Sequence, residues 1–144
     1  MDKTTAKLMK SARKATKSAY APYSNFKVGA AILLKNGKTF KGSNFENASY
    51  PLCLCAERVV LAAAHACQPN KIIKVIAVTA KNEAKKLTKP VSPCGACRQV
   101  LVEVEKKQKH PLKVILQGEE GPIYVFDSAK ELLPLGFGGD QFRI

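Results

Sequence analysis

The apolar positions of this chain alternate between helical and strand-like spacing. In residues 4–19 they recur every three or four residues, which predicts an amphipathic helix that ends before Pro22. Residues 28–34 form a continuous apolar run, typical of a central strand that is covered on both faces. Asn36-Gly37 then predicts a hairpin turn, and residues 38–42 the returning antiparallel strand.

The middle of the chain predicts two further helices around a third strand. A polar segment, residues 44–51, leads to residues 55–67, which are apolar nearly all round and predict a buried helix. Residues 72–80 are rich in β-branched side chains and predict a strand, followed by a charged loop over residues 81–91. Pro93 fits the start of a third helix. The residues of this helix that are expected to face the sheet are Val100, Leu101 and Val104.

Two short strands and a short helix complete the pattern. The loop between residues 113–117 and residues 123–126 is too short for a parallel crossover, so these two strands are expected to be antiparallel. Ser128 is a good N-cap for a short helix that ends near Leu133. The order αββαβαββα therefore predicts an α/β fold, a mixed five-stranded sheet with helices on both faces, in a single domain over residues 1–144.

The cysteine spacing points to a metal site. Cys94 and Cys97 form a Cys-x-x-Cys pair, and Cys55 supplies a third thiol at the predicted start of another helix. Three thiolates fill three positions of a tetrahedral zinc ion and leave the fourth open for water, as in catalytic zinc sites. Neither histidine offers a comparable fourth ligand, because His65 lies within an apolar helix and His110 in a basic loop.

Glu57 lies two residues after Cys55, where it is well placed to exchange protons with a water on the zinc ion. Zinc lowers the pKa of such a water from about 15.7 towards about 7, which supplies hydroxide at neutral pH. Three thiolates carry more charge than one zinc ion balances. Arg58 and Arg98, together with the dipoles of the two helix N-termini, are expected to offset this excess.

Other interpretations of the cysteines are weaker. A Cys-x-x-Cys pair alone is also typical of redox proteins, but a third cysteine followed by Glu57 favours zinc. Glu57 is correctly spaced from Cys55 and not from Cys53. Cys53 and Cys67 are therefore interpreted as small packing residues. The odd total of five cysteines favours a reducing compartment over a disulfide framework.

Four blocks of sequence resemble the small homotetrameric cytidine deaminases of nucleoside salvage. They are Tyr20-Ala21-Pro22-Tyr23-Ser24-Asn25-Phe26-Lys27-Val28-Gly29-Ala30-Ala31, Gly42-Ser43-Asn44-Phe45-Glu46-Asn47-Ala48, the zinc motif Cys55-Ala56-Glu57 with Pro93-Cys94-Gly95-Ala96-Cys97-Arg98-Gln99, and Glu131-Leu132-Leu133-Pro134. Cys55 stands where many zinc deaminases have histidine. The resemblance covers residues 15–140. It implies a three-layer α/β fold, one zinc ion per subunit, and deamination of cytidine and 2′-deoxycytidine to uridine and 2′-deoxyuridine plus ammonia in pyrimidine salvage.

The resemblance also implies roles for individual residues. Glu57 is expected to protonate N3 of cytosine as hydroxide attacks C4, and then to pass the hydroxyl proton to the departing amino group. Asn44 and Glu46 resemble a clamp on the sugar 3′-hydroxyl. Phe26 resembles the residue that stacks on the base, and the backbone N–H of Ala56 is expected to reach the pyrimidine oxygen. From the residues alone, Asn44 is also interpretable as a turn residue, with less reason for Glu46, and Phe26 as a core residue that begins a strand.

Phe137 lies in a glycine-rich stretch, residues 136–140, that is flexible by composition. It resembles an aromatic residue that enters a neighbouring subunit's active site. This resemblance implies a homotetramer whose active sites are completed across subunits, so that a monomer would be nearly inactive.

The formal net charge of +13 raises the question of a nucleic-acid partner. Six of the cations lie in the first predicted helix: Lys3, Lys7, Lys10, Arg13, Lys14 and Lys17. No recognisable binding module or interleaved aromatic residues accompany them, so a solvated surface is expected and nucleic acid is not. The sequence shows no signal segment, and its apolar runs are much shorter than the ~20 residues of a membrane span. A soluble cytoplasmic protein is therefore expected.

Two alternative functions stay open from the sequence. A related zinc deaminase could act on another aminopyrimidine nucleoside or on cytosine in a polynucleotide, although the Glu46 carboxylate would repel a 3′-phosphate. A non-enzymatic zinc module that binds nucleic acid through its basic surface would need a fourth protein ligand. The sequence offers no candidate for that ligand.

Overall fold

The computed structural model describes residues 2–142. Its helices are α1 (Lys3–Ala15), α2 (Ala56–Cys67) and α3 (Gly95–Gln108). Its strands are β1 (Phe26–Leu34), β2 (Thr39–Ser43), β3 (Ile73–Asn82), β4 (Lys113–Gln117) and β5 (Ile123–Phe126). Short 3₁₀ turns are η1 (Thr16–Ser18), η2 (Tyr50–Leu52), η3 (Ala129–Leu132) and η4 (Gly139–Phe142). The predicted order of elements is confirmed, except that the last expected helix is the 3₁₀ turn η3, which Ser128 caps as predicted.

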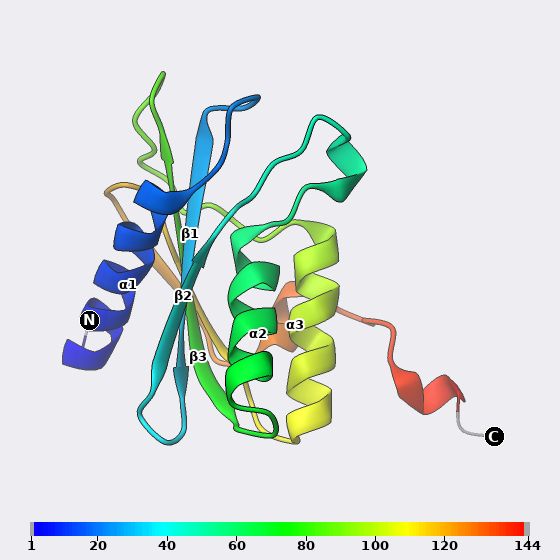
Figure 1. Cartoon of the computed structure of the whole chain (residues 1–144). Coiled ribbons are helices and arrows are strands. Elements are labelled where there is room, and N and C mark those ends of the chain that lie inside the picture. Colours follow the sequence, from blue (N-terminus) through cyan, green and yellow to red (C-terminus); the bar gives the residue numbers. More distant parts are fainter. Residues whose placement is uncertain (1, 143–144) are drawn as a thin grey trace.

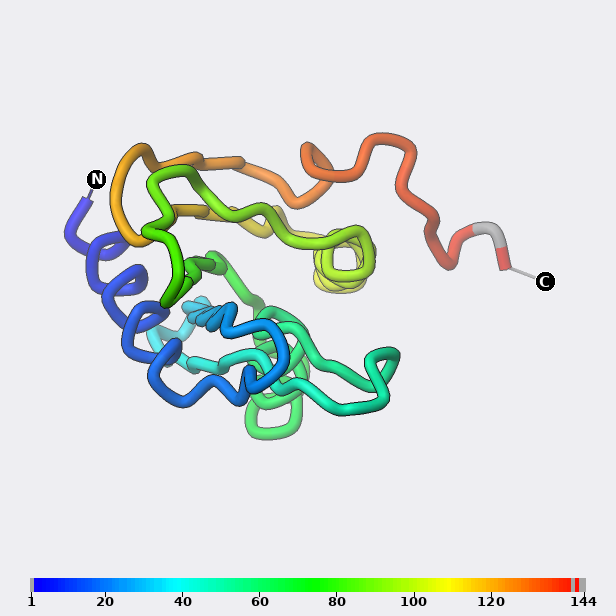
Figure 2. The backbone as a smooth tube through the Cα atoms, turned by 90° about the horizontal axis from the view of Figure 1, so that it is seen from above, coloured from blue at the N-terminus to red at the C-terminus, as the bar shows by residue number. Residues whose placement is uncertain are grey.

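The strands form one mixed sheet in the order β2-β1-β3-β4-β5. β1 pairs antiparallel with β2 and β3, β3 pairs parallel with β4, and β4 pairs antiparallel with β5 as predicted. Figures 1 and 2 show three layers, with α1 on one face of the sheet and both α2 and α3 on the other. The predicted three-layer α/β fold is confirmed. Within residues 2–142, no helix has the length and apolar character needed to cross a bilayer.

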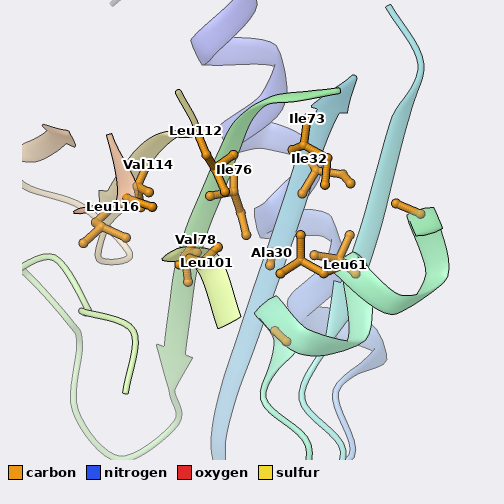
Figure 3. Close-up of a cluster of buried hydrophobic side chains, with 14 of the residues drawn as sticks. Ala30, Ile32, Leu61, Ile73, Ile76, Val78, Leu101, Leu112, Val114 and Leu116 are labelled. Carbon is orange, nitrogen blue, oxygen red and sulfur yellow. The ribbon is translucent and has the colours of Figure 1, made fainter. Parts of the chain in front are cut away.

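The central strands bury side chains on both faces. Figure 3 shows the core between the sheet and the two helices α2 and α3, with labelled residues Ala30, Ile32, Leu61, Ile73, Ile76, Val78, Leu101, Leu112, Val114 and Leu116. The intervening strand residues face α1. Together with residues of that helix they form a second cluster, which contains Leu8, Met9, Ala12, Ala31, Ala77 and Ile115. Coverage on both sides explains why β1 and β3 are continuous apolar runs and do not alternate.

Two glycines allow helices to approach the sheet closely. A Cβ atom on Gly29 would overlap the carbonyl oxygen of Ala12 in α1. A Cβ atom on Gly42 would lie 3.0 Å from the backbone nitrogen of Val60 in α2. The positions of α1 over β1 and of α2 over β2 therefore both depend on a missing side chain.

Some boundaries differ from the predicted ones. The first helix ends at Ala15 and not at residue 19, because the Thr16 hydroxyl donates to the Arg13 carbonyl oxygen at 2.8 Å and the chain tightens into η1. β3 extends to Asn82, where it pairs with Phe26 at the start of β1. In α3, Leu101 is fully buried, and the other two predicted residues pack against the core while partly exposed.

The prediction that α2 is buried all round was wrong. Val60, Leu61 and Ala64 pack against the sheet and are 6% exposed or less, whereas Ala62 and Ala63 are exposed. A single helix on a sheet buries one stripe, and the small alanine side chain makes exposure of the other faces inexpensive.

Glu105 in α3 is a buried carboxylate that sequence patterning did not single out. It is 5% exposed and accepts hydrogen bonds from the Ser128 hydroxyl at 2.6 Å and from the backbone N–H groups of Leu112 (2.9 Å) and Ala129 (2.8 Å). Burial alone would raise its pKa, but these donors outweigh it and lower the pKa. Glu105 therefore ties α3 to the start of β4 and to η3.

We expect Glu105→Gln to lower the free energy of unfolding at pH 7 by about 2 kcal/mol, because an amide cannot accept from all of these donors. The folded-state pKa of Glu105 lies below the reference value of 4.5, so its stabilisation is present above that pH and is lost as the pH falls through the folded pKa. Urea unfolding of both proteins at neutral and acidic pH measures this. Glu103→Gln, an exposed change on the same helix, is the control. A deficit that is the same at both pH values would contradict the prediction.

Candidate functional site

The candidate site lies where α2 and α3 begin. Figure 1 shows these N-termini side by side at the same end of the sheet. Cys55 and Cys94 are the N-cap residues of the two helices, each in extended backbone, and neither thiol caps its own helix. Cys97 lies in the first turn of α3. The local structure thus presents three thiols at two helix N-termini, where the dipoles favour negative charge.

The three predicted ligands converge. The sulfur atoms of Cys55, Cys94 and Cys97 all lie within 4.8 Å of one another, and those of Cys55 and Cys94 are 3.9 Å apart. Cys97 is fully buried, Cys55 is half-buried and Cys94 is exposed, so the cluster opens on one side. Among residues 2–142, no histidine or carboxylate joins this group.

The protonation of the thiols suits a divalent cation. A hydrogen bond from Cys97 lowers the pKa of Cys55 to about 5, with further help from Arg58, while the same bond and burial raise the pKa of Cys97. Without a cation, Cys55 and Cys97 therefore share a proton, and their two sulfurs do not both ionise. A zinc ion would take the place of that proton, and three sulfur donors with one open side fit its tetrahedral preference.

Glu57 is the second residue of α2 and is 4% exposed. Burial raises the pKa of its carboxyl group, and the negative charge of Cys55 acts in the same direction. Such a carboxyl group accepts and releases a proton closer to neutral pH than an exposed glutamate does. It lies beside the thiols of Cys55 and Cys97 and outside the ligand set.

The two predicted arginines lie in different places. Arg58 contacts the site directly, because its Nη2 atom donates to the Cys53 carbonyl oxygen at 3.3 Å and lies 3.8 Å from the Cys55 sulfur. Its Nε atom is buried and has no hydrogen-bond partner within the described chain, so the Nη2 contacts hold the guanidinium in place. It partly offsets the excess negative charge of three thiolates.

Arg98 supports the loop that leads to the second ligand. It donates to the carbonyl oxygens of Pro93 at 2.9 Å and Leu132 at 3.1 Å, and to the Ser92 hydroxyl at 2.6 Å. These contacts fix the backbone ahead of Cys94. Arg98 therefore positions a ligand, in contrast to the direct contact that Arg58 makes.

The predicted sugar-binding residues are held by the protein itself. Asn44 accepts from the backbone N–H of Val28 and donates to the carbonyl oxygen of Phe26, both at 2.8 Å, so it fixes the start of β1. Glu46 accepts from the backbone N–H of Tyr23 at 2.9 Å and from the backbone and hydroxyl of Ser24. The role of Ser24 was missed by sequence reasoning, although it lies within the block Tyr20–Ala31. Its hydroxyl lowers the pKa of Glu46, which is therefore ionised at neutral pH.

The remaining predicted residues are placed as follows. Phe26 begins β1 and is half-buried, and Ala56 is the first residue of α2 with its side chain fully buried. Phe137 is 52% exposed, its carbonyl oxygen accepts from Gln99, and its ring stacks edge-on against Phe142. Figures 1 and 2 show this segment leading away from the sheet.

The two spare cysteines have different environments. The Cys53 sulfur forms hydrogen bonds with the backbone N–H and carbonyl oxygen of Asn47. These hydrogen bonds close the loop that precedes the first ligand. Cys67 is exposed at the end of α2, so its interpretation as a packing residue was wrong.

Comparison with known proteins gives a consistent result. Residues 2–110 match the family model for the cytidine and deoxycytidylate deaminase zinc-binding region. The chain is 43% identical to a cytidine deaminase of Halalkalibacterium halodurans over 94% of this chain and 96% of the relative. It is 39% identical to a cytidine deaminase of Mycoplasma genitalium over 90% and 92% of the two chains.

Solved structures of proteins similar in sequence have the same fold. The crystal structure of cytidine deaminase from Burkholderia pseudomallei superposes with a TM-score of 0.80 at 45% identity, covering 95% of this chain and all of the other. The cytidine deaminase from Mycobacterium tuberculosis superposes with a TM-score of 0.74 at 35% identity, covering 95% and 99%.

We expect Cys97→Ala to lower the zinc content from one ion per chain to well below one after dialysis, because it removes the buried ligand. Cys67→Ala removes an exposed thiol outside the cluster and should leave the zinc content unchanged. Elemental analysis of the purified proteins measures both. Full zinc occupancy in Cys97→Ala would show that the ion is held elsewhere.

Proposed function

Because this chain belongs to the cytidine and deoxycytidylate deaminase family, we propose that it catalyses the zinc-dependent hydrolysis of cytidine and 2′-deoxycytidine to uridine and 2′-deoxyuridine with release of ammonia. The observation that carries this proposal is the cluster of Cys55, Cys94 and Cys97 with the buried Glu57 beside it. A closed structural zinc site would need a fourth protein ligand, and none joins the cluster within the described residues.

The chain's own residues supply proton transfer and positioning. When bound to the three thiolates, zinc lowers the pKa of a water so that hydroxide is available at neutral pH. Glu57 takes a proton from the attacking water and delivers it to N3 of the cytosine ring as the bond from oxygen to C4 forms. It later carries the proton of the new C4 hydroxyl to the amino group as the C4–N bond breaks and ammonia leaves. Its raised pKa suits it to accept each proton before passing it on.

We propose the following substrate contacts. The backbone N–H of Ala56 lies in the first turn of α2, where N–H groups lack acceptors within the helix, and it donates to the pyrimidine oxygen. Phe26 stacks on the base. Glu46 accepts from the sugar 3′-hydroxyl, and Asn44 contributes by fixing the backbone of Phe26.

The ionised Glu46 also supports a free nucleoside over a polynucleotide as substrate. A 3′-phosphate next to this carboxylate would meet like charge. Deamination of another aminopyrimidine nucleoside remains the alternative activity, and a panel of nucleosides assayed with the same protein distinguishes it.

We expect Glu57→Gln to retain zinc while kcat for cytidine falls by about 10²–10⁴, the usual contribution of a general acid/base. Loss of absorbance, ammonia release and zinc content measured on the same samples separate proton transfer from metal binding. Glu83→Gln, which neutralises an exposed carboxylate paired with Lys27, is the matched control and should have unchanged kcat. A zinc-loaded Glu57→Gln enzyme with kcat within about threefold of wild type would overturn the assigned role.

We also propose that four copies assemble and complete each other's active sites. Large apolar side chains are exposed around the loops next to the thiols: Phe45, Tyr50, Leu52 and Leu54 are 45–67% exposed. Ala62, Ala63 and Ala66 of α2 are exposed as well.

Phe137 is the residue proposed to reach the neighbour. We expect Phe137→Ala to lower kcat/KM at least about tenfold without loss of zinc, while Phe142→Ala has a smaller effect. Mixing and reassembling Phe137→Ala with Glu57→Gln should restore activity above the sum of the two, because a Glu57→Gln chain can lend its Phe137 to an intact site. Light scattering gives the oligomeric state. A fully active monomer, or a mixture no more active than its parts, would contradict shared sites.

The cellular setting is also a proposal. Conversion of cytidine nucleosides to uridine nucleosides fits a role in pyrimidine salvage. The described cysteines are all free, and three of them are grouped for metal binding, which supports a reducing compartment such as the cytoplasm. One sheet with a core on each face supports a single catalytic domain over residues 1–144.

A further inference from the structure

The lysines of α1 are not explained by deamination. Lys3, Lys7, Lys10 and Lys14 follow each other at intervals of four and three residues, so they form one stripe along the helix. All four are exposed, and none belongs to an ion pair within residues 2–142. The nearest acid in sequence, Asp2, is occupied as the N-cap of α1 through its bond to Thr5. Cytidine is uncharged, so the catalysed reaction gives this charge no role.

These lysines line a groove of about 590 Å³ between α1 and the β1–β2 hairpin. Leu8 and Leu33 contribute to its wall from α1 and β1, and Gly37 and Thr39 contribute from the hairpin. Lys41 pairs across the sheet with Ala31, whose side chain belongs to the cluster under α1, so Lys41 projects from this same face. The zinc cluster lies at the helices on the opposite face.

The chemistry of the groove selects among anionic partners. A helix that lies in a membrane interface needs a free apolar face, but Leu8, Met9 and Ala12 of α1 are buried against the sheet. Within the described part of the chain, no aromatic side chain lines the groove, so these residues offer no platform for stacking bases. Flexible lysine ammonium groups in a row suit repeated phosphates read by charge alone.

We propose that this groove, formed by α1 and the β1–β2 hairpin, binds the sugar-phosphate backbone of nucleic acid without regard to sequence. From Lys3 to Lys14 the helix rises about 16 Å at about 1.5 Å per residue. This length matches about five nucleotides of one strand at about 3.4 Å each. The proposal departs from the solvated surface expected from sequence, because periodicity alone did not show that the lysines share a groove. It is independent of the catalytic assignment, since the groove contains none of the proposed catalytic residues.

The test uses the full-length, zinc-loaded protein and a fluorescent oligouridylate of about 20 nucleotides, titrated at several salt concentrations between about 50 and 200 mM. One variant changes Lys3, Lys7, Lys10 and Lys14 to Gln. The matched control changes four exposed lysines outside the groove, Lys71, Lys74, Lys85 and Lys107, to Gln and so removes the same net charge. Cytidine deamination measured on every sample reports folding and the catalytic site separately.

We expect the groove variant to bind at least about tenfold more weakly and its salt slope to fall by about 3, since each phosphate contact contributes about 0.7 for a single strand. The control variant should stay within about threefold of wild type, and deamination should be unchanged in both. Equal weakening in the two variants would show that only net charge matters and would overturn the proposal. Absent binding to the oligonucleotide, or binding only to vesicles of anionic phospholipid that the groove variant loses, would also overturn it.

Discussion

The structure depends on bringing the first turns of two helices together around three thiolates. This requirement is met by the order of the strands. β2 and β3 are both antiparallel to β1 and therefore parallel to each other, and β3 is parallel to β4. The connections through α2 and α3 are thus two crossovers that run in the same direction over the same face of the sheet (Figure 1). Both helices must begin at the same edge, and the ligands are the residues with which they begin.

Two buried glutamates on this face show how the surroundings of a carboxyl group determine the direction in which its pKa shifts. Glu105 receives an O–H and two N–H donors, so its charged form is stabilised and its pKa is lowered. Glu57 is buried near a thiolate and its pKa is raised. A carboxylate held by several donors stays ionised and ties elements together, whereas one whose burial outweighs its donors is more easily protonated.

Sequence alone predicted the sheet and the ligand set because both rest on local signals. Apolar runs mark β1 and β3. The spacing of Cys94 and Cys97 is what one helical turn can present to a metal, and Glu57 follows Cys55 by two residues at the start of the other helix. The role of Glu105 could not be predicted, since its partners lie beyond its own helix, just before β4 and at the start of η3. The separate roles of Arg58 and Arg98 depend likewise on which backbone carbonyls the fold brings near each guanidinium.

The apolar pattern of the sequence also gave a wrong prediction of which apolar side chains are exposed. The alanines of α2 satisfy every pattern for a buried helix, yet only the stripe over Gly42 meets the sheet. On the opposite face, the same sheet separates α1 from the thiols, so the charged side chains of α1 make no contact with the metal ligands. Residues on the side of α1 that faces the sheet are constrained by the close approach of the helix to Gly29. Residues on its solvent-facing side are not constrained in this way. A fold with this arrangement can keep one chemistry on one face of the sheet while the other face acquires an unrelated binding surface.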